Sequence, residues 1–427
     1  MDTIFALATA QGRAGVAVIR ISGPMAFACA QDLCDTLPDT RTAVVRNIRD
    51  RDGNVLDQAL VLRFAGPHSF TGEDVVEFHM HGSIAVVAAV LRVLGQGNAR
   101  LAEPGEFTRR ALENDKMDLA QVEGLGDLIE AETEGQRRQA LRIVQGALGQ
   151  RIEQWRSQLI RAAALVEVTI DFADEDVPVD VSPEVVTLLD AVLNEVQDEI
   201  DGFQAAERIR TGFEVAIIGR PNAGKSTLLN ALARREAAIT SAQAGTTRDV
   251  IEVRMDLSGY AVTLLDTAGL RDSGDEVEVE GIKRAVMRAE AADLRIFLAE
   301  PGETLNVSAQ PGDIHVAPKA DLRDDNVSAV SGTSGAGIPE LIDMVSQRLS
   351  RMSQSAGLAT HMRHRTAMLS SVSALRTAMG HVGHGPEHYD IAAEEIRTAI
   401  RSLEALVGRI DVENLLDEIF SSFCLGK

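Results

Sequence analysis

Residues 213–226 read Phe-Glu-Val-Ala-Ile-Ile-Gly-Arg-Pro-Asn-Ala-Gly-Lys-Ser, and this stretch decides the fold of the middle of the chain. A predicted strand runs into Gly219, and the residues from Gly219 to Ser226 match the phosphate-binding pattern G-x-x-x-x-G-K-[ST]. A helical pattern follows at once. Strand, glycine loop and helix in this order turn backbone N–H groups and a helix N-terminus toward phosphate oxygens. We therefore expect Lys225 to meet the β- and γ-phosphates of a nucleotide and Ser226 to bind Mg²⁺.

Two downstream motifs supply partners for the metal ion and the γ-phosphate. Asp266-Thr267-Ala268-Gly269 ends a predicted hairpin strand about 40 residues after the loop. An Asp at such a strand end holds Mg²⁺, often through water, and the glycine N–H faces the γ-phosphate. Gly245-Thr246-Thr247-Arg248-Asp249 lies between the two motifs and offers Thr247 as a further Mg²⁺ ligand.

The base-recognition motif indicates guanine. In Pro318-Lys319-Ala320-Asp321, the Asp carboxylate can accept both the N1–H and the 2-amino group of guanine, and adenine has no such pair of donors. Ser331-Gly332-Thr333 fits a second base-contacting loop. Most GTPases carry an Asn at the position of Pro318, where it braces the loops and touches the base. Its replacement predicts weak nucleotide binding with fast exchange. The helix usual between residues 299 and 314 of such domains is predicted to be shortened or missing.

The residue that orients the attacking water is not settled by spacing. Leu270 stands where Ras-type GTPases have a water-positioning glutamine. The acidic segment that follows offers several carboxylates, which equally suit a solvated helix start near its positive dipole. They are Asp272, Asp275, Glu276, Glu278 and Glu280.

Composition limits the class of protein. The 427 residues predict two to four domains. A net charge of −22 and an aromatic content of 4% disfavour a broad basic face for duplex nucleic acid or a base-stacking platform. Three cysteines exclude a disulfide framework. No apolar stretch is long enough to cross a membrane, so we expect a cytoplasmic protein with no membrane partner.

The pattern of elements predicts three kinds of structure along the chain. An α+β region reaches about residue 115, with strands at 16–19 and 59–62 and a helix at 84–94. Apolar residues at three- and four-residue steps predict helices at 117–208 and again from 389 to 420. An α/β pattern at 210–350 lies between them, as if inserted into one helical bundle.

Nearly the whole chain resembles a bacterial family of tRNA uridine-modification GTPases known as MnmE or TrmE. Besides the GTPase motifs, the resemblance is carried by these segments: Gly105-Glu106-Phe107-Thr108-Arg109-Arg110-Ala111, Lys116-Met117-Asp118-Leu119, Ile170-Asp171-Phe172 and Phe423-Cys424-Leu425-Gly426-Lys427. The resemblance implies a multidomain α/β plus all-α protein with a Ras-like P-loop domain inserted into a helical domain. The implied domains are a folate-binding and dimerisation domain (1–116), a helical domain in two parts (117–209 and 357–427) and the GTPase domain (210–356).

The resemblance also implies a reaction and its participants. Family members act as homodimers with an FAD-containing partner, MnmG (GidA), in a heterotetramer or larger complex. Together they add an aminomethyl or carboxymethylaminomethyl group to carbon 5 of the wobble uridine of certain tRNAs. The one-carbon unit comes from a tetrahydrofolate derivative (5-formyl- or 5,10-methylene-tetrahydrofolate), and FAD stays on the partner. The alternative is a regulatory GTPase acting in ribosome assembly or signalling, which would need neither the segment 106–116 nor Lys427.

Site residues follow from the motifs together with the resemblance. The implied folate-binding residues are Arg20, Glu77, Lys116 and Lys427. Potassium would bind Asn222, Ser241, Gln243 and Thr246, taking the place of an arginine finger, and Glu278 would orient the water. Cys424 has no base beside it in the sequence and is more often packed than catalytic. The expected GTP-binding residues are Asn222, Ala223, Gly224, Lys225, Ser226, Thr227, Ser241, Ala242, Gln243, Ala244, Gly245, Thr246, Thr247, Asp266, Thr267, Ala268, Gly269, Lys319, Asp321, Ser331, Gly332 and Thr333.

Overall fold

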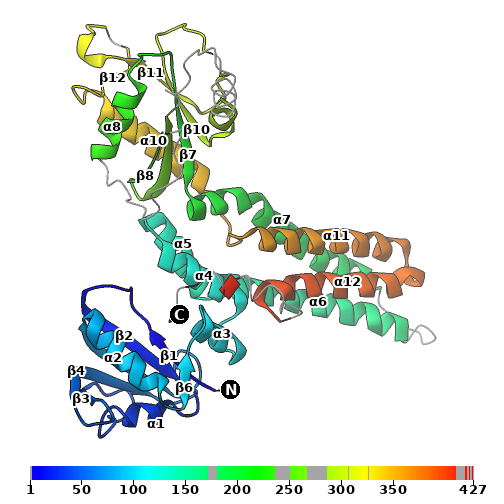
Figure 1. The fold of residues 1–427 in the computed structure, drawn as a ribbon. Helices are drawn as coiled ribbons and strands as arrows, with labels where there is room; N and C mark the ends of the chain where they lie inside the picture. Colours follow the sequence, from blue (N-terminus) through cyan, green and yellow to red (C-terminus); the bar gives the residue numbers. More distant parts are fainter. Residues whose placement is uncertain are drawn as a thin grey trace, which may run out of the picture. The chain divides into compact units, whose positions relative to one another are not determined.

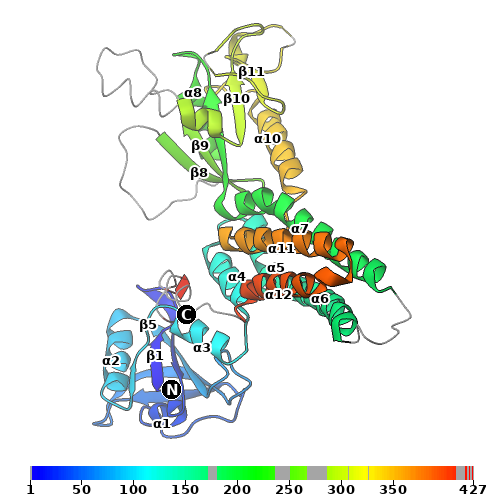
Figure 2. The same cartoon turned by 90° about the vertical axis from the view of Figure 1, so that its right-hand side faces the viewer.

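The computed structural model describes residues 2–171, 180–235, 251–266, 286–305, 307–325, 327–409, 419, 420, 423 and 426. Its contacts divide the chain into two compact units. One comprises Met1–Gly126 with Glu404–Lys427, and the other comprises Asp127–Leu403. The elements of both are labelled in Figures 1 and 2. None of the helices in the described residues is both long enough and apolar enough to cross a membrane.

The first unit is built on a six-stranded sheet in the order β3-β4-β5-β2-β1-β6, in which only the β1–β6 pair is parallel. The predicted strands at 16–19 and 59–62 lie inside β2 and β4, and the predicted helix is α2. The elements in chain order are β1 (Thr3–Leu7), β2 (Ala14–Ser22), α1 (Ala26–Gln31), β3 (Val44–Arg49), β4 (Val55–Phe64), β5 (Val75–Gly82), α2 (Ile84–Gly95), β6 (Ala99–Leu101), α3 (Glu106–Glu113) and α4 (Leu119–Glu130).

The two faces of this sheet carry different side chains because strand residues alternate in direction. Ile19 and Ile21 of β2 point to the face covered by α1 and α2, where they join the main core. Arg20, between them, points to the other face. There a smaller cluster forms around Ile4, Ala6, Ala102 and Phe107, with Phe70 packed against it. The alternation therefore places Arg20 beside this second, smaller cluster.

The second unit contains long amphipathic helices. They are α5 (Glu134–Val144), α6 (Ala147–Asp171), α7 (Ser182–Thr211), α11 (Met362–His384) and α12 (Tyr389–Glu404), with the 3-10 turn η3 (Pro386–His388) between α11 and α12. The 3-10 turn η4 (Ala405–Val407), which follows α12, belongs to the first unit. Thr133 begins α5 with a capping box to Gln136. Trp155 is fully buried, and its indole N–H donates to Glu195 Oε2 at 2.9 Å. The helices predicted from apolar spacing are therefore present wherever the structure describes them.

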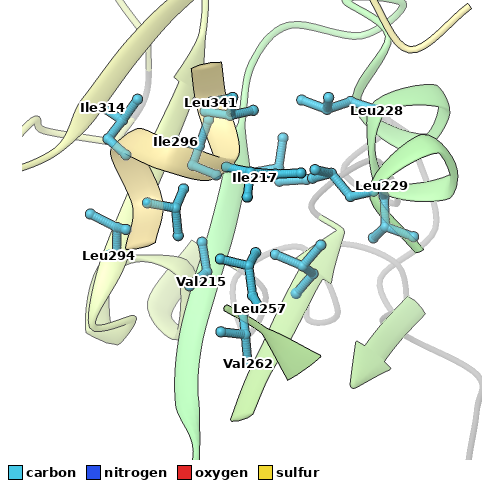
Figure 3. Close-up of a cluster of buried hydrophobic side chains, with 14 of the residues drawn as sticks. Val215, Ile217, Leu228, Leu229, Leu257, Val262, Leu294, Ile296, Ile314 and Leu341 are labelled. Carbon is cyan, nitrogen blue, oxygen red and sulfur yellow. The ribbon is translucent and has the colours of Figure 1, made fainter. Parts of the chain in front are cut away.

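An α/β layer follows α7 in the same unit. Its sheet has the order β12-β11-β10-β7-β9-β8, and every neighbouring pair is parallel except β8–β9. Figure 3 shows Val215 and Ile217 of the central strand among side chains from α8 and α10. The elements are β7 (Phe213–Ile218), α8 (Lys225–Arg235), β8 (Ile251–Leu257), β9 (Tyr260–Asp266), β10 (Leu294–Leu298), β11 (Ile314–Pro318), η2 (Ala320–Leu322), β12 (Ala329–Val330) and α10 (Ile338–Ser353).

Two details of this layer bear on the predictions. The edge strand beside β11 is short, since β12 spans only Ala329–Val330. The described residues between β10 and β11 form no helix, as the sequence predicted. An open groove of about 670 Å³ lies there instead, and Phe297 stacks on His315 in its lining with the ring centroids 4.8 Å apart.

Candidate functional site

The nucleotide motifs meet at one edge of the second sheet. The carboxyl ends of parallel strands share an edge, where α/β proteins bind their ligands. The phosphate loop follows β7, the segment Lys319–Asp321 follows β11, and Ser331 follows β12. Asp266, at the end of β9, is in register with Ile217 of β7. Segments more than 100 residues apart in the chain therefore come to the same edge.

The phosphate loop has the backbone geometry that its sequence predicts. Gly224 has φ +95°, and a Cβ there would meet nothing within 4 Å, so the space above it is open. Asn222 is also left-handed, with φ +64°. The Lys225 ammonium is buried and donates to the carbonyls of Gly219 and Arg220 at 2.8 and 3.0 Å. A bound phosphate would replace these carbonyls with charged acceptors, which form stronger hydrogen bonds with an ammonium.

The second base-contacting loop lies directly against the first turn of α8. A Cβ on Gly332 would be 2.6 Å from the backbone C and O of Thr227, so only glycine permits this approach. Ser331 is buried, and its Oγ accepts from Ser334 N at 3.2 Å. A pocket of about 550 Å³ opens between α8 and this loop, with Thr227, Gly332 and Thr333 in its lining. Three of the expected GTP-binding residues thus line one pocket.

The guanine-recognition residues are accessible to a ligand. Lys319 is exposed and adopts a left-handed conformation with φ +58°. Asp321 is exposed in the 3-10 turn η2 that follows. The turn presents its side chain at the carboxyl edge of β11, as recognition of a bound base requires.

Several expected site residues lie outside the described residues. They are Ser241, Ala242, Gln243, Ala244, Gly245, Thr246, Thr247, Thr267, Ala268, Gly269, Glu278, Cys424 and Lys427. For Asp266, only the backbone is described. Within the described part of the chain, no group of three or more His, Cys, Asp or Glu side chains is arranged to hold a metal ion. The expected metal ligands Ser226 and Asn222 are described, and they lie on the loop itself.

Two of the expected folate-binding residues contact each other directly. Arg20 Nε donates to Glu77 Oε1 at 2.9 Å across the β2–β5 pair. Glu77 Oε2 also lies 3.1 Å from His79 Nε2. The Arg20 guanidinium lies over two aromatic rings, 5.1 Å from the centroid of Phe70 and 5.7 Å from that of Phe107. The aromatic pair was missed by sequence reasoning, although Phe107 stands inside one of the family-like segments.

Lys116 belongs to the same neighbourhood through a loop. A Cβ on Gly72 would be 3.0 Å from Lys116 Cε, so the lysine stem packs against the loop that also carries Phe70. Asn114 Nδ2 fastens this loop by donating to Thr71 O at 2.7 Å. Arg20, Glu77 and Lys116 are thus gathered around one loop.

The C-terminal segment approaches the same strands. A Cβ on Gly426 would be 2.1 Å from Leu7 O, so this glycine packs against the end of β1 without room for a side chain. Ala6, the preceding residue of β1, is in register with Arg20. The residue just before Lys427 is therefore next to the strand that borders Arg20.

A charged network holds the family-like segment 105–111 in place. Arg110 is 4% exposed and donates to Glu73, Glu106 and Asp2 at 2.7–3.2 Å. Burial alone raises the pKa of Glu106, but hydrogen bonds from Arg100, from the Glu103 N–H and from Arg110 outweigh it and lower that pKa. The hydrogen bond from Arg100 is also the main cause that lowers the pKa of Asp2. These groups are mutually satisfied, so their role is to fix α3 and the N-terminal strand.

Comparison with known proteins gives a consistent result over the full length. Residues 3–116 match the model described as the GTP-binding protein TrmE N-terminus, and residues 119–424 match the model of the MnmE helical domain. Curated relatives named tRNA modification GTPase MnmE are 63% identical in Roseobacter denitrificans and 62% identical in Ruegeria pomeroyi, each over 100% of both chains.

A solved structure of Era, in complex with MgGDPNP and nucleotides 1506–1542 of 16S ribosomal RNA, is 24% identical to this chain. The match covers 32% of this chain and 56% of that one, with a TM-score of 0.24.

Proposed function

Since the chain belongs to the MnmE family of tRNA modification GTPases, we propose that it uses GTP hydrolysis to drive modification of carbon 5 of the wobble uridine in certain tRNAs. The added group is aminomethyl or carboxymethylaminomethyl, and a tetrahydrofolate derivative supplies its one-carbon unit. One observation carries this proposal. Among the described residues, the phosphate loop and the two base-recognition loops share a chain with the Arg20–Glu77 pair, its aromatic neighbours and Lys116.

The residues of the phosphate loop suit a Mg²⁺–GTP complex. Gly224 leaves open space for phosphate oxygens, and the Lys225 ammonium faces carbonyls that a phosphate would displace. Ser226 stands in the first turn of α8, where its hydroxyl would hold Mg²⁺ together with Thr247. Asn222 projects from the left-handed bend of the loop and would be the side-chain ligand of K⁺. The monovalent ion would stabilise charge that develops on the phosphates as two G domains meet.

The N-terminal cluster suits a reduced folate by its chemistry. A carboxylate such as Glu77 can accept two hydrogen bonds from the pterin's amidine-like edge. Phe70 and Phe107 offer flat apolar faces next to Arg20, against which a ring can pack. Lys116 and Lys427 would meet the ligand's carboxylates. Folate would have to replace the contacts of Glu77 with Arg20 and His79. The free energy of folate binding must offset the loss of these contacts.

Two partners complete the proposed reaction. A second copy of this chain would pair through the N-terminal unit, and an FAD-containing MnmG (GidA) protein would supply redox chemistry. The side of the first sheet that bears Arg20 and Glu77, where Phe70 and Phe107 also pack, is the surface that a second N-terminal unit or a bound folate would contact. The tRNA would then be shared between this chain and its partner.

The test is the modification state of tRNA in cells. We expect mass analysis of tRNA from cells lacking this chain to find wobble uridine without its carbon 5 group, and wild-type complementation to restore it. Complementation by Lys225→Ala should fail, because that variant cannot hold nucleotide phosphates. Fully modified uridine in the deleted cells, together with defective ribosome assembly, would instead identify a regulatory GTPase.

A further inference from the structure

A turn of four residues bridges the two loops that bind opposite ends of the nucleotide. In the sheet order β11-β10-β7, strand β10 lies between the strand of the base loop and the strand of the phosphate loop. The chain leaves β10 at Leu298 and makes a turn over residues 300–303. This turn therefore comes between the phosphate loop and the guanine-recognition segment at the carboxyl edge.

The turn contacts both loops through ion pairs. Glu303 pairs with Arg220, the second residue of the phosphate loop. Glu300 accepts from Arg323 Nη1 at 2.7 and 2.8 Å, and Arg323 lies two residues beyond Asp321. Arg323 also donates to the Asp325 carboxylate at 3.0 and 2.7 Å. One guanidinium is thus fixed by two carboxylates.

The two acidic residues of the turn are also bonded to each other. Glu300 N donates to Glu303 Oε2 at 2.9 Å, and Glu303 N donates to Glu300 O at 3.0 Å. The Glu303 carboxylate therefore accepts the hydrogen bond within the turn with Oε2 and pairs with Arg220 through Oε1. The turn is thus internally bonded while it pairs with a residue of each nucleotide loop.

The sequence explains why such a bridge is needed here. The Asn that braces these loops in most GTPases is replaced by Pro318, which has neither a side-chain donor nor a backbone N–H. Pro318 is the last residue of β11 and pairs with Val330 only through its strand register. The bracing function is therefore missing from its usual position, whereas an ion-paired turn links the same two loops.

We propose that Glu300 and Glu303 are positioning residues for guanine-nucleotide binding, which hold the phosphate loop and the base loop at their working separation in place of the missing Asn. The inference rests on this chain binding GTP and GDP. It does not require either residue to touch the nucleotide. It also offsets part of the weak binding that Pro318 by itself predicts.

The exposure of these pairs determines which measurement can detect the brace. Arg220 is 66% exposed and Glu300 52% exposed, whereas Glu303 and Arg323 are each 16% exposed. Exposed ion pairs contribute little to global stability. Nucleotide affinity is more sensitive, because a ligand that bridges two loops binds less well when the loops must first be ordered.

The experiment measures GDP affinity of the full-length protein by calorimetry. The double variant Glu300→Gln/Glu303→Gln should bind GDP roughly five- to tenfold more weakly, a loss expected when a modest ion-pair contribution is removed. Each single variant should lose part of this. Glu252→Gln is the matched control, since Glu252 is also ion-paired within the same domain, to Arg288, but on β8. The control should retain wild-type affinity, and all variants should keep the wild-type melting temperature.

Placing the usual Asn at position 318 distinguishes a positioning role of Glu300 and Glu303 from a merely structural one. Pro318→Asn should raise GDP affinity clearly in the double variant and only slightly in the wild-type background, since two braces for the same loops are not additive. Equal gains in both backgrounds would overturn the proposal, as would unchanged affinity in the folded double variant. A complete absence of GDP binding by the wild-type chain would instead contradict the GTPase function itself.

Discussion

Arg20 and Glu77 are 57 residues apart in the sequence, yet Arg20 Nε lies 2.9 Å from Glu77 Oε1 on neighbouring strands. The pair stands on the sheet face that α1 and α2 leave open, with Phe70 and Phe107 beside the guanidinium. In the proposed folate site, Glu77 would accept hydrogen bonds from the ligand's heterocycle, and Arg20 holds the Glu77 carboxylate in place.

Removing either member of the pair should weaken binding of a reduced folate. We expect Glu77→Gln to lower the affinity for 5-formyltetrahydrofolate by roughly tenfold or more, because it removes a charged acceptor of hydrogen bonds. Arg20→Ala should do the same and also remove its contact with the two rings. Calorimetry with the full-length chain measures both. Arg46→Ala, on β3 of the same sheet, is the matched control and should bind normally.

Removal of Lys427 should weaken folate binding and leave GTP hydrolysis largely intact. The physical reason is that Gly426 packs against the end of β1, the strand that borders Arg20, and Lys427 is the next residue in the sequence. Unchanged folate affinity in a chain that ends at Gly426 would remove Lys427 from the site.

The glycine at the base loop should be intolerant of any side chain. In Gly332→Ala, the new Cβ would meet the Thr227 backbone at 2.6 Å and push the loop away from α8. GDP affinity should fall by about tenfold or more, because the loop contacts the ligand directly. Gly335→Ala is the control: its Cβ meets nothing, although its φ of +79° still strains the backbone. Similar losses in both variants would mean that a side chain at either position of this loop weakens binding, and that the close approach of Gly332 to Thr227 is not the specific cause.

Hydrolysis should depend on potassium through Asn222. Because Asn222 has φ +64°, alanine there also strains the backbone, and glycine separates the two effects. We expect wild-type hydrolysis to be much faster in K⁺ than in Na⁺ at equal ionic strength, and both Asn222→Ala and Asn222→Gly to lose the difference. A K⁺ response retained by Asn222→Gly alone would show that the side chain is no ligand.

Glu278→Ala should cost about 10²-fold in kcat with little change in nucleotide affinity.

The charged network around Arg110 predicts acid-labile folding of the first unit. The pKa of Glu106 is lowered in the folded state, so its contribution to stability is complete above its ordinary pKa of about 4.3 and is lost as pH falls through the folded value. Hydrogen exchange of peptides from this unit should therefore accelerate as pH drops below about 4, after correction for intrinsic rates. Glu106→Gln should flatten this dependence.

Arg110→Met should destabilise the same unit at neutral pH by about 3–5 kcal/mol, because Glu73 would lose its cation and Glu106 would keep only Arg100. If Arg110→Met lowered the melting temperature by less than Glu106→Gln does, Arg110 would not be the group that holds this network together.

The contiguous motifs were readable from sequence because their function resides in neighbouring residues. The loop ending in Lys225 and Ser226 has the predicted backbone, and the helix missing before β11 is missing among the described residues. Contacts between residues that are far apart in the sequence could not be predicted in the same way. The segment Glu300-Pro301-Gly302-Glu303 resembles an ordinary surface turn until strand order places it between two nucleotide loops. Phe70 likewise could not be linked to Arg20 from the sequence, because its ring meets the Arg20 guanidinium only in the folded chain.

Under the proposed function, GTP hydrolysis by this chain drives transfer of a one-carbon unit from folate to tRNA. A reconstituted reaction tests this with the purified chain, an FAD-containing partner, unmodified tRNA and tetrahydrofolate labelled with ¹³C in its one-carbon unit. We expect ¹³C in the substituent at uridine carbon 5 when GTP and K⁺ are present, and none when GTP is omitted or Lys225→Ala replaces the wild-type chain. Equal incorporation with and without GTP, or modified uridine that carries no label, would contradict it.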